Sequence, residues 1–295
     1  MGLGSTKRKN ISVFDVINVI IMLFVVVVTL YPFLYLTALS MSSEKYVYEG
    51  SITFYPKGFT LGTYKVLLKD NYFWTSYRNT IIYTVLGTLI SLTLTVLLAY
   101  PLSKKNLKGR GIFLGFILFT MFFGGGLIPT YLLVSRMLQM RNTIWAVIIP
   151  GAISTYNVLV TKTFFEGIPD ELEEAAAIDG MNTYGILVKI VLPLSKPILA
   201  TMSLFYAVGI WNNWFGPFIY LDDKKLFPVS LYLRNIIAGA QKAREVVGGD
   251  VEGFGDIEAT IKSASMVVSA LPIIMVYPFL QKYFVKGIMI GSLKG

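Results

Sequence analysis

The chain is 295 residues long, and 55% of these residues are hydrophobic whereas only 15% are charged. Soluble domains average about 45–50% apolar and 25% charged residues, so this composition argues against a soluble enzyme. His and Cys are both absent, which excludes disulfides, the usual zinc sites and a Ser-His-Asp triad. The net charge of +9 comes from short basic clusters beside apolar segments, a distribution that indicates membrane orientation rather than nucleic-acid binding.

The first apolar segment runs from about Val13 to Leu39 and follows the basic residues 7–9. A basic start and the small-residue ending Ala38-Leu39-Ser40 also occur in signal peptides, so cleavage is a minor alternative. The apolar core of a signal peptide runs only about 7–15 residues. The length of this segment therefore favours a retained spanning helix.

Further apolar segments, each roughly 20 residues long and so long enough to cross a bilayer, follow along the chain. They are Thr80–Tyr100, Ile112–Leu133, Ile144–Phe165, Ile198–Leu221 and Ala264–Phe284. The sequence thus predicts an all-α integral membrane protein with about six transmembrane helices in a single domain, residues 1–295. Prolines within these segments and the run Gly124–Gly126 predict that several helices are kinked or broken.

The short basic loops predict the orientation of the chain in the membrane. The loop after the second span carries Lys104, Lys105, Lys108 and Arg110 and no acidic residue, so this loop and the basic N-terminus are expected in the cytoplasm. Six crossings then place 166–196 and the tail 285–295 inside as well. The segments 41–79, 134–142 and 222–262 would lie outside.

No charged residue occupies the centre of a predicted span. Ion-coupled carriers usually contain such residues, which are costly in the bilayer and are kept for function. Their absence argues against coupling to an ion gradient, although backbone carbonyls or Asn and Ser oxygens could still bind sodium.

The predicted cytoplasmic segment 166–196 contains a short helix. Pro169 fits its first position, and Asp170 and Glu171 suit the positive first turn. Gly180 is placed to end the helix in a left-handed conformation. Leu172, Ala175 and Ala176 would share one face, and a second short helix is expected from Thr183 to Val191, stopped at Pro193. The residues alone fit either docking in a groove of another protein or an ordinary solvated loop.

The residues Glu174-Ala175-Ala176, Gly180, Ile190 and Leu192-Pro193 have a spacing that resembles the EAA motif of permease subunits of binding-protein-dependent ABC importers. The resemblance covers residues 13–295. It is closest to the carbohydrate class, which includes the smaller maltose permease subunit, and within it to permeases for complex oligosaccharides. The outer segment 52–60, Trp211-Asn212 and the tail 287–295 support it, whereas the chain departs from the family at Met181, Asn213 and Met289-Ile290.

The resemblance implies a type I ABC importer permease fold and a place in the bacterial inner membrane, with both chain ends cytoplasmic. The expected partners are a homologous second permease, two ATPase subunits, an extracytoplasmic solute-binding protein and a sugar. The chain has no phosphate-binding G-x-x-x-x-G-K-[ST] motif, so it is expected to be non-catalytic and without a cofactor, with ATP and Mg²⁺ bound by the ATPases. The residues that the resemblance assigns to ATPase coupling are Glu174, Ala175, Ala176, Asp179, Gly180, Leu192 and Pro193. Of these, Glu174 is expected to pair with a basic residue of the ATPase.

Two further sets of residues are candidates for ligand or partner contacts. Sugar hydroxyls can bond Asn side chains and sugar C–H groups can stack on Trp rings, so Trp211, Asn212, Asn213, Trp214 and Asn157 could line a sugar path; interhelical packing is the favoured alternative. The family's tail reaches between the ATPases, which implies contacts for Lys286, Gly291 and Lys294; a frayed end is the alternative. The Gly-rich, acidic residues 248–255 indicate either a flexible outer loop or a docking site for the solute-binding protein.

The sequence therefore predicts a transmembrane subunit of an ATP-driven sugar importer. An ion-coupled secondary transporter is the main rival, and it would take up its substrate without any ATPase. A membrane scaffold that transports nothing is a second rival. Catalysis is the weakest interpretation, because no nucleophile paired with a base and no set of metal ligands is present.

Overall fold

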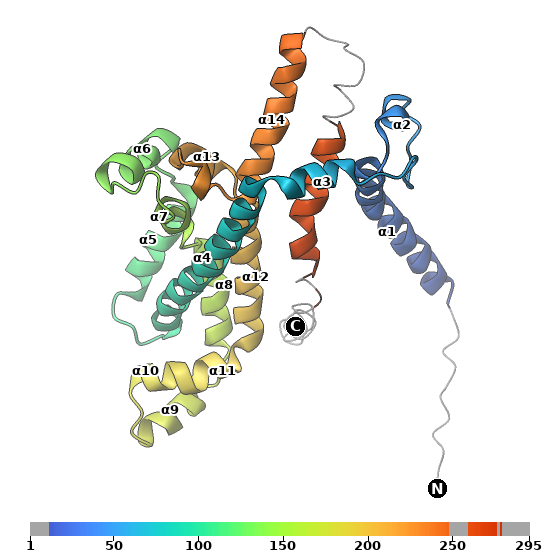
Figure 1. The fold of residues 1–295 in the computed structure, drawn as a ribbon. Helices are drawn as coiled ribbons and strands as arrows, with labels where there is room; N and C mark the ends of the chain where they lie inside the picture. The colour runs from blue at the N-terminus through green and yellow to red at the C-terminus, as the bar shows by residue number, and fades with distance from the viewer. Residues whose placement is uncertain (1–11, 248–258, 276–277, 279–295) are drawn as a thin grey trace. The chain divides into compact units, whose positions relative to one another are not determined.

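The computed structural model describes residues 12–247, 259–275 and 278, with the side chains of 240–247 excepted. Every regular element among these residues is helical (Figure 1). The chain forms two compact units. Of the described residues, one unit takes 12–66 together with 237–247 and 259–268, and the other takes 67–236 together with 269–275 and 278.

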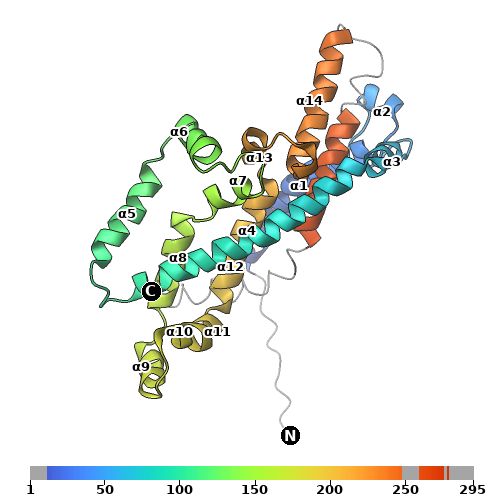
Figure 2. The same cartoon turned by 60° about the vertical axis from the view of Figure 1, so that its left-hand side comes forward.

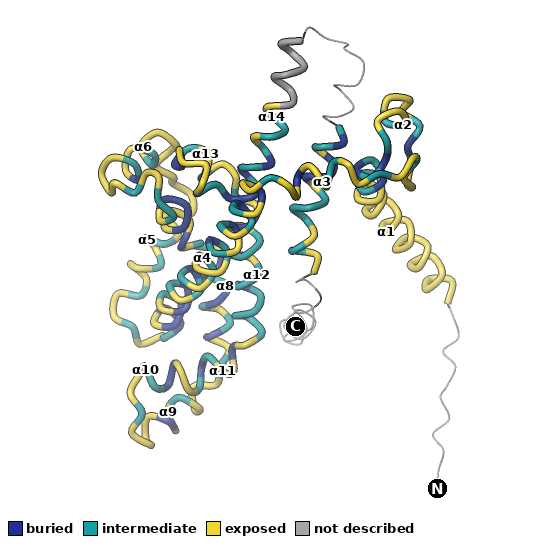
Figure 3. The backbone as a smooth tube through the Cα atoms, in the orientation of Figure 1, coloured by how far each residue is buried: buried dark blue, intermediate teal, exposed yellow. Residues whose placement is uncertain are grey.

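The first unit contains α1 (Val13–Ser40) and α2 (Glu44–Tyr48). Ser12 and Asp15 form a capping box at the start of α1, which satisfies backbone N–H groups that a helix end leaves unpaired. Its apolar side chains are exposed along most of the helix (Figure 3), as expected for a helix that faces lipid or another membrane helix. The hydroxyls of Ser40 and Tyr64 lie 2.7 Å apart and join the end of α1 to the start of α3 (Gly62–Lys69).

The core of the second unit is made by α4 (Asn71–Ser103), α8 (Thr155–Glu166) and α12 (Lys196–Asn212), which pack along one another in both views (Figures 1 and 2). A stripe of small buried residues on α4 permits this close approach. The Tyr206 hydroxyl lies 2.7 Å from the Thr95 hydroxyl and accepts a hydrogen bond from the Ser154 backbone N–H, so it joins all three elements. The stripe consists of Ser76, Thr80, Gly87, Ser91, Thr95 and Ala99.

Several of the predicted spans are broken, as expected from the prolines and glycines that they contain. α5 (Arg110–Phe122) ends before the Gly124–Gly126 run, and the chain bends by 110° into α6 (Leu127–Leu132) and the π-helical turn η1 (Leu133–Met137). The fourth predicted span consists of α7 (Trp145–Ile148), a 3₁₀ turn at 149–151 and α8. The fifth is divided at Asn213 and Trp214 into α12 and α13 (Phe215–Tyr220).

Within the described residues, α1 and α4 are long and apolar enough to cross a membrane as single helices. Two bent pairs, α5 with 127–137 and the run Thr183–Leu194 with α12, also meet that criterion, and the helix Ala259–Met275 is shorter. The first predicted span agrees with α1 to within one residue. The second was predicted too short, because α4 begins nine residues earlier at Asn71, where Asp70 caps it by accepting a hydrogen bond from the Tyr72 N–H.

The segment 222–262, predicted as an outer loop, contains the 3₁₀ turn η4 (Lys224–Leu226) and the 19-residue helix α14 (Val229–Val247). Val229 and Leu233 at its start pack against Trp211. The Tyr232 hydroxyl donates a hydrogen bond of 2.6 Å to Asp70. The pKa of Tyr232 is raised, mainly by burial and to a smaller extent by this hydrogen bond. The predicted flexible or docking stretch 248–255 lies outside the described residues.

Candidate functional site

The 166–196 loop contains the short helices α9 (Asp170–Ile178), α10 (Thr183–Ile186) and α11 (Leu192–Leu194), with a π-helical turn at Leu187–Val191. Together they lie at one end of the helical core (Figure 1). Pro169 is the N-cap of α9 rather than its first residue. Gly180 has a φ of 83°, so the predicted left-handed end is confirmed.

The second short helix was predicted to stop at Pro193. In the structure the helical run continues past this residue to Leu194. The π-helical turn at Leu187–Val191 explains the difference. A proline removes a backbone donor and clashes with the preceding turn of a regular α-helix, whereas a π-helical turn widens that turn and changes the hydrogen-bond pattern. The chain then bends by 83° into α12, so the 166–196 loop leads directly into a core helix.

Apolar contacts attach the 166–196 loop to the core. Ala176 on α9, Ile186 on α10 and Val191 are buried in one cluster with Tyr100 of α4 and Phe165 of α8. The predicted small-residue face of α9 is therefore divided, because Ala176 is buried whereas Leu172 and Ala175 are exposed. Burial of the Ala176 side leaves the opposite side of α9 available to a partner.

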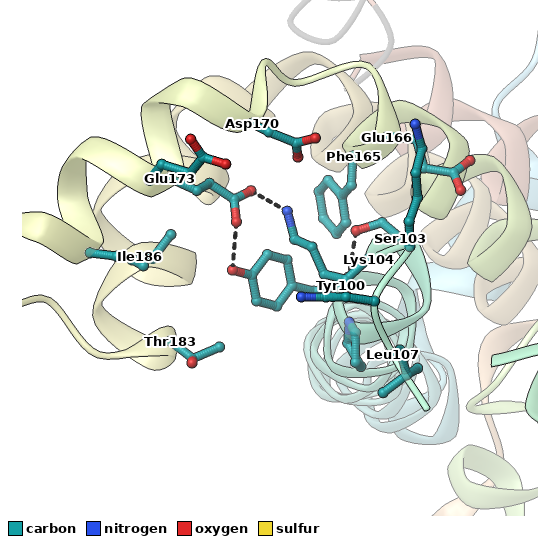
Figure 4. Close-up of a pocket in the computed structure, with 15 residues that line it drawn as sticks. Tyr100, Ser103, Lys104, Leu107, Phe165, Glu166, Asp170, Glu173, Thr183 and Ile186 are labelled. Carbon is teal, nitrogen blue, oxygen red and sulfur yellow. Dashed lines mark hydrogen bonds and ion pairs between the residues drawn. The ribbon is translucent and has the colours of Figure 1, made fainter. Parts of the chain in front are cut away.

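An ion pair and a hydrogen bond add to this attachment (Figure 4). The Lys104 Nζ at the end of α4 lies 2.5 Å from Oε1 of Glu173 on α9. The Tyr100 hydroxyl donates a 3.0 Å hydrogen bond to the other carboxylate oxygen of Glu173. Lys104 and Glu173 are mostly shielded from solvent, which strengthens the interaction relative to a surface pair.

Arg110 and Glu166 form a second polar connection near the first. The Arg110 guanidinium donates to the Leu102 carbonyl at the end of α4 and pairs with Glu166 at the end of α8. Lys162, one turn earlier on α8, lies 2.8 Å from the same carboxylate. Lys104 and Arg110 thus each pair with an acidic residue of another element, Glu173 on α9 and Glu166 at the end of α8.

A cleft of about 640 Å³ lies between the end of α4 and the 166–196 loop (Figure 4). The Lys104–Glu173 pair and Glu174 are among the residues that line it. Its wall thus contains both acidic and basic side chains, drawn from three separate parts of the chain. The remaining lining residues include Tyr100, Leu107, Phe165, Asp170, Thr183 and Ile186.

The outer side of the 166–196 loop combines acidic and apolar side chains. Glu174 and Ala175 on α9 and Asp179, its C-cap residue, are exposed. Ile178 is 87% exposed and Tyr184 is 75% exposed, values unusual for large apolar and aromatic side chains without a membrane or a partner. We call Glu174, Ala175, Ile178, Asp179 and Tyr184 the loop face. Of the other residues assigned to coupling, Leu192 packs against the core cluster and Pro193 is exposed.

The predicted sugar-path residues have different surroundings. Trp211 is buried and donates a 3.0 Å hydrogen bond from Nε1 to the Ser269 carbonyl. Asn213 accepts from the Gly216 N–H with its side chain and from Ser230 with its carbonyl. Asn157 is buried in α8, whereas Asn212 is exposed.

Trp214 is 40% exposed at the break between α12 and α13. The guanidinium of Arg234 on α14 lies over its ring, 4.6 Å from the centroid. The five predicted path residues thus differ in exposure and contacts, and their role in a sugar path stays a prediction. The tail residues Lys286, Gly291 and Lys294 lie outside the described residues, so their predicted contacts stay predictions.

Some residues of these sites were not identified from the sequence. The Lys162–Glu166 pair has helical i, i+4 spacing, so an examination of α8 could have found it. Glu173 is 69 residues from Lys104 and 73 from Tyr100, and no local pattern connects such distant positions. The contact of Arg234 with Trp214 likewise depends on the return of α14 to the end of α12.

The fold and the 166–196 loop define a class of protein: an all-helical integral membrane subunit with a helical loop fixed to the end of its core and an exposed face on that loop. Residues 11–290 match the family model described as the inner membrane component of binding-protein-dependent transport systems. The chain belongs to this family, whose members are transport subunits, and the resemblance inferred from the EAA-like spacing is confirmed.

Named relatives match almost the whole chain. Protein LplC of Bacillus subtilis (strain 168) is 43% identical over 289 residues, which cover 98% of this chain and 97% of LplC. The polygalacturonan/rhamnogalacturonan transport system permease protein YtcP of the same organism is 39% identical over 290 residues, covering 97% of this chain and 100% of YtcP. A chain of a solved bacterial ABC transporter for import of the acidic polysaccharide alginate superposes with a TM-score of 0.80 at 35% identity, covering 92% of this chain and 96% of that one.

Proposed function

We propose that this chain is the permease subunit of an ATP-driven importer and forms one half of its path across the membrane. A homologous permease would supply the other half, two ATPase subunits would supply the energy, and an extracytoplasmic binding protein would deliver the substrate. The observation that carries the proposal is the match along nearly the full chain to a transport system permease protein at 39% identity and to a chain of an alginate-importing ABC transporter at 35% identity. The basic loop at Lys104–Arg110 supports a cytoplasmic location for the 166–196 loop.

The loop face is the proposed docking surface for an ATPase. It offers the Glu174 carboxylate for a charge pair and the exposed Ile178 and Tyr184 side chains for apolar contact. Because the opposite side of α9 is fixed to α4 and α8, a movement of the docked ATPase would reach the core helices instead of being absorbed by a loose loop. The 166–196 loop also continues through an 83° bend into α12, so a movement of the loop would reach this core helix directly as well.

The proposed substrate is an acidic oligosaccharide. YtcP is named for polygalacturonan and rhamnogalacturonan, and the similar solved transporter is named for alginate. These polymers contain uronic acid units, so their fragments carry carboxylates. Two relatives named for acidic sugars support this class over a neutral oligosaccharide.

The test starts with purification of the chain from its native membranes, followed by identification of the proteins that accompany it. We expect an ATPase and a second permease. The complex, reconstituted in vesicles with its binding protein, should take up tri- or tetragalacturonate or alginate oligomers only when ATP is supplied. Recovery of the chain alone, with uptake driven by a sodium or proton gradient, would overturn the proposal in favour of an ion-coupled transporter.

A further inference from the structure

A cation lies on two aromatic rings at the break between α12 and α13. The Arg234 guanidinium carbon is 4.6 Å from the centroid of the Trp214 ring and 4.3 Å from that of Phe218. The two ring centroids are 6.2 Å apart, with the rings tilted by 55°. A cation over an aromatic ring is attracted by the negative face of the ring, so both rings hold the guanidinium in place. We call Arg234, Trp214 and Phe218 the arginine-aromatic cluster.

The positive charge of Arg234 has no acidic partner among the described residues. The carboxylates of the surrounding segments have other partners. Asp70 accepts from the Tyr232 hydroxyl at 2.6 Å, and Asp222 lies 3.0 Å from Arg141. Asp223 accepts from the Lys225 N–H at the start of η4. Among the described residues, therefore, no carboxylate neutralises the charge of Arg234, and a guanidinium of this kind is suited to pair with the carboxylate of a ligand.

The two rings are also available, since Trp214 is 40% exposed and Phe218 is 47% exposed. The backbone at Asn213 and Trp214 is non-helical. Irregular backbone at membrane depth is tolerated only against protein or a water-filled cavity, so this break is suited to face an aqueous path. Exposed aromatic surface for sugar C–H groups thus adjoins a guanidinium for a carboxylate.

We propose that the arginine-aromatic cluster binds the carboxylate of a uronic acid unit as the sugar passes this chain, with Arg234 forming the charge pair and Trp214 the stacking surface. A guanidinium matches a carboxylate with two parallel hydrogen bonds, which a neutral hydroxymethyl group cannot form. The inference rests on the proposed function and extends it, because it assigns recognition of the acidic group to residues of this subunit.

The test uses the reconstituted complex with its binding protein. KM for uptake is measured with trigalacturonate and with its carboxyl-reduced, neutral counterpart. Arg234→Gln should raise KM for trigalacturonate by about ten- to a hundredfold, the effect expected from loss of a hydrogen-bonded charge contact, with little change for the neutral trimer. Arg234→Lys keeps the charge but not the planar fork, so part of the preference should remain. Arg141→Gln is the matched control, because it removes an exposed arginine that is paired with Asp222 and lies on no aromatic ring.

Three results would overturn the inference. In the first, Arg234→Gln leaves the preference for trigalacturonate unchanged. In the second, it weakens uptake of both trimers equally. In the third, it lowers ATPase stimulation by the sugar-free binding protein, which would assign Arg234 to contact with that protein. Measurements on the wild-type complex distinguish this inference from the proposed function. If the wild type does not prefer trigalacturonate over the neutral trimer, the proposed acidic substrate class itself is overturned.

Discussion

The Nζ of Lys104, the C-cap residue of α4, lies 2.5 Å from a carboxylate oxygen of Glu173 in the middle of α9. Lys104 also lies 5.2 Å from the centroid of the Tyr100 ring, whose hydroxyl donates to the same carboxylate. A long core helix is thus joined through a shielded ion pair to the helix that carries the loop face. The relationship matters for coupling because rigid attachment is required for a force on α9 to reach α4.

A double-mutant cycle tests the Lys104–Glu173 pair. Lys104→Gln and Glu173→Gln should each lower the free energy of unfolding by about 1–3 kcal/mol, because each leaves a mostly shielded charge without its partner. The double variant should lose less than the sum, with a coupling energy of about 1 kcal/mol or more. Thermal or chemical unfolding in detergent measures these values.

The matched controls for this cycle are Lys105→Gln and Glu171→Gln, which change the same residue types at exposed neighbouring positions. Their effects should stay within about 0.5 kcal/mol. Strictly additive losses in the Lys104–Glu173 cycle would show that the pair contributes nothing to the attachment of α9.

Glu174→Ala should give a different result from Glu173→Gln, although the two positions are adjacent. Glu174 is exposed, so its loss should change the free energy of unfolding by no more than about 0.5 kcal/mol. Loss of a charge pair with the ATPase should nevertheless weaken docking by about 2–5 kcal/mol. Co-purification of the ATPase and substrate-stimulated ATP hydrolysis are the measurements. Normal association and normal stimulation in this variant would exclude the docking role of Glu174.

The adjacent residues Glu173 and Glu174 show how far the sequence could be interpreted. The EAA-like spacing identified the family and the loop, because a motif depends on local spacing alone. It did not reveal that Glu173 turns toward Lys104 while Glu174 stays exposed, since that difference depends on a contact across 69 residues. The basic residues Lys104 and Arg110 were interpreted only as orientation signals, yet both also pair with acidic residues.

The helices show the same division between local and long-range information. The apolar run at Val13–Ser40 and the break at Gly124–Gly126 were predictable, because hydrophobic length and glycine act locally. The early start of α4 was not predicted, because residues 71–79 are too polar for a lipid-facing span. They are helical because Asp70 caps them and Phe73 and Ser76 are buried.

Gly180 provides a test of loop geometry that leaves side-chain contacts unchanged. Its φ is 83°, and an added Cβ would meet no atom within 4 Å, so a substitution acts through the backbone alone. Gly180→Ala should destabilise the turn by about 1 kcal/mol, whereas Gly180→Asn should cost less because Asn tolerates the left-handed region. Limited proteolysis of the 166–196 loop should show faster cleavage in the Ala variant. Equal protection in both variants and the wild type would contradict this account of the turn.

The packing of α4 against α12 gives a prediction for the membrane core. A Cβ added at Gly87 would lie 2.7 Å from the terminal methyl of Ile210, so the two helices approach each other closely here. Gly87→Ala should be tolerated after a rotation of Ile210, whereas Gly87→Leu should cost about 1–3 kcal/mol through overpacking. Combining Gly87→Leu with Ile210→Ala should recover much of that loss, as measured by thermal unfolding in detergent. Gly209→Leu is the control, because a Cβ at Gly209 meets nothing within 4 Å. A loss in the Gly87→Leu variant that Ile210→Ala does not reduce would place the steric conflict elsewhere than at the α4–α12 contact.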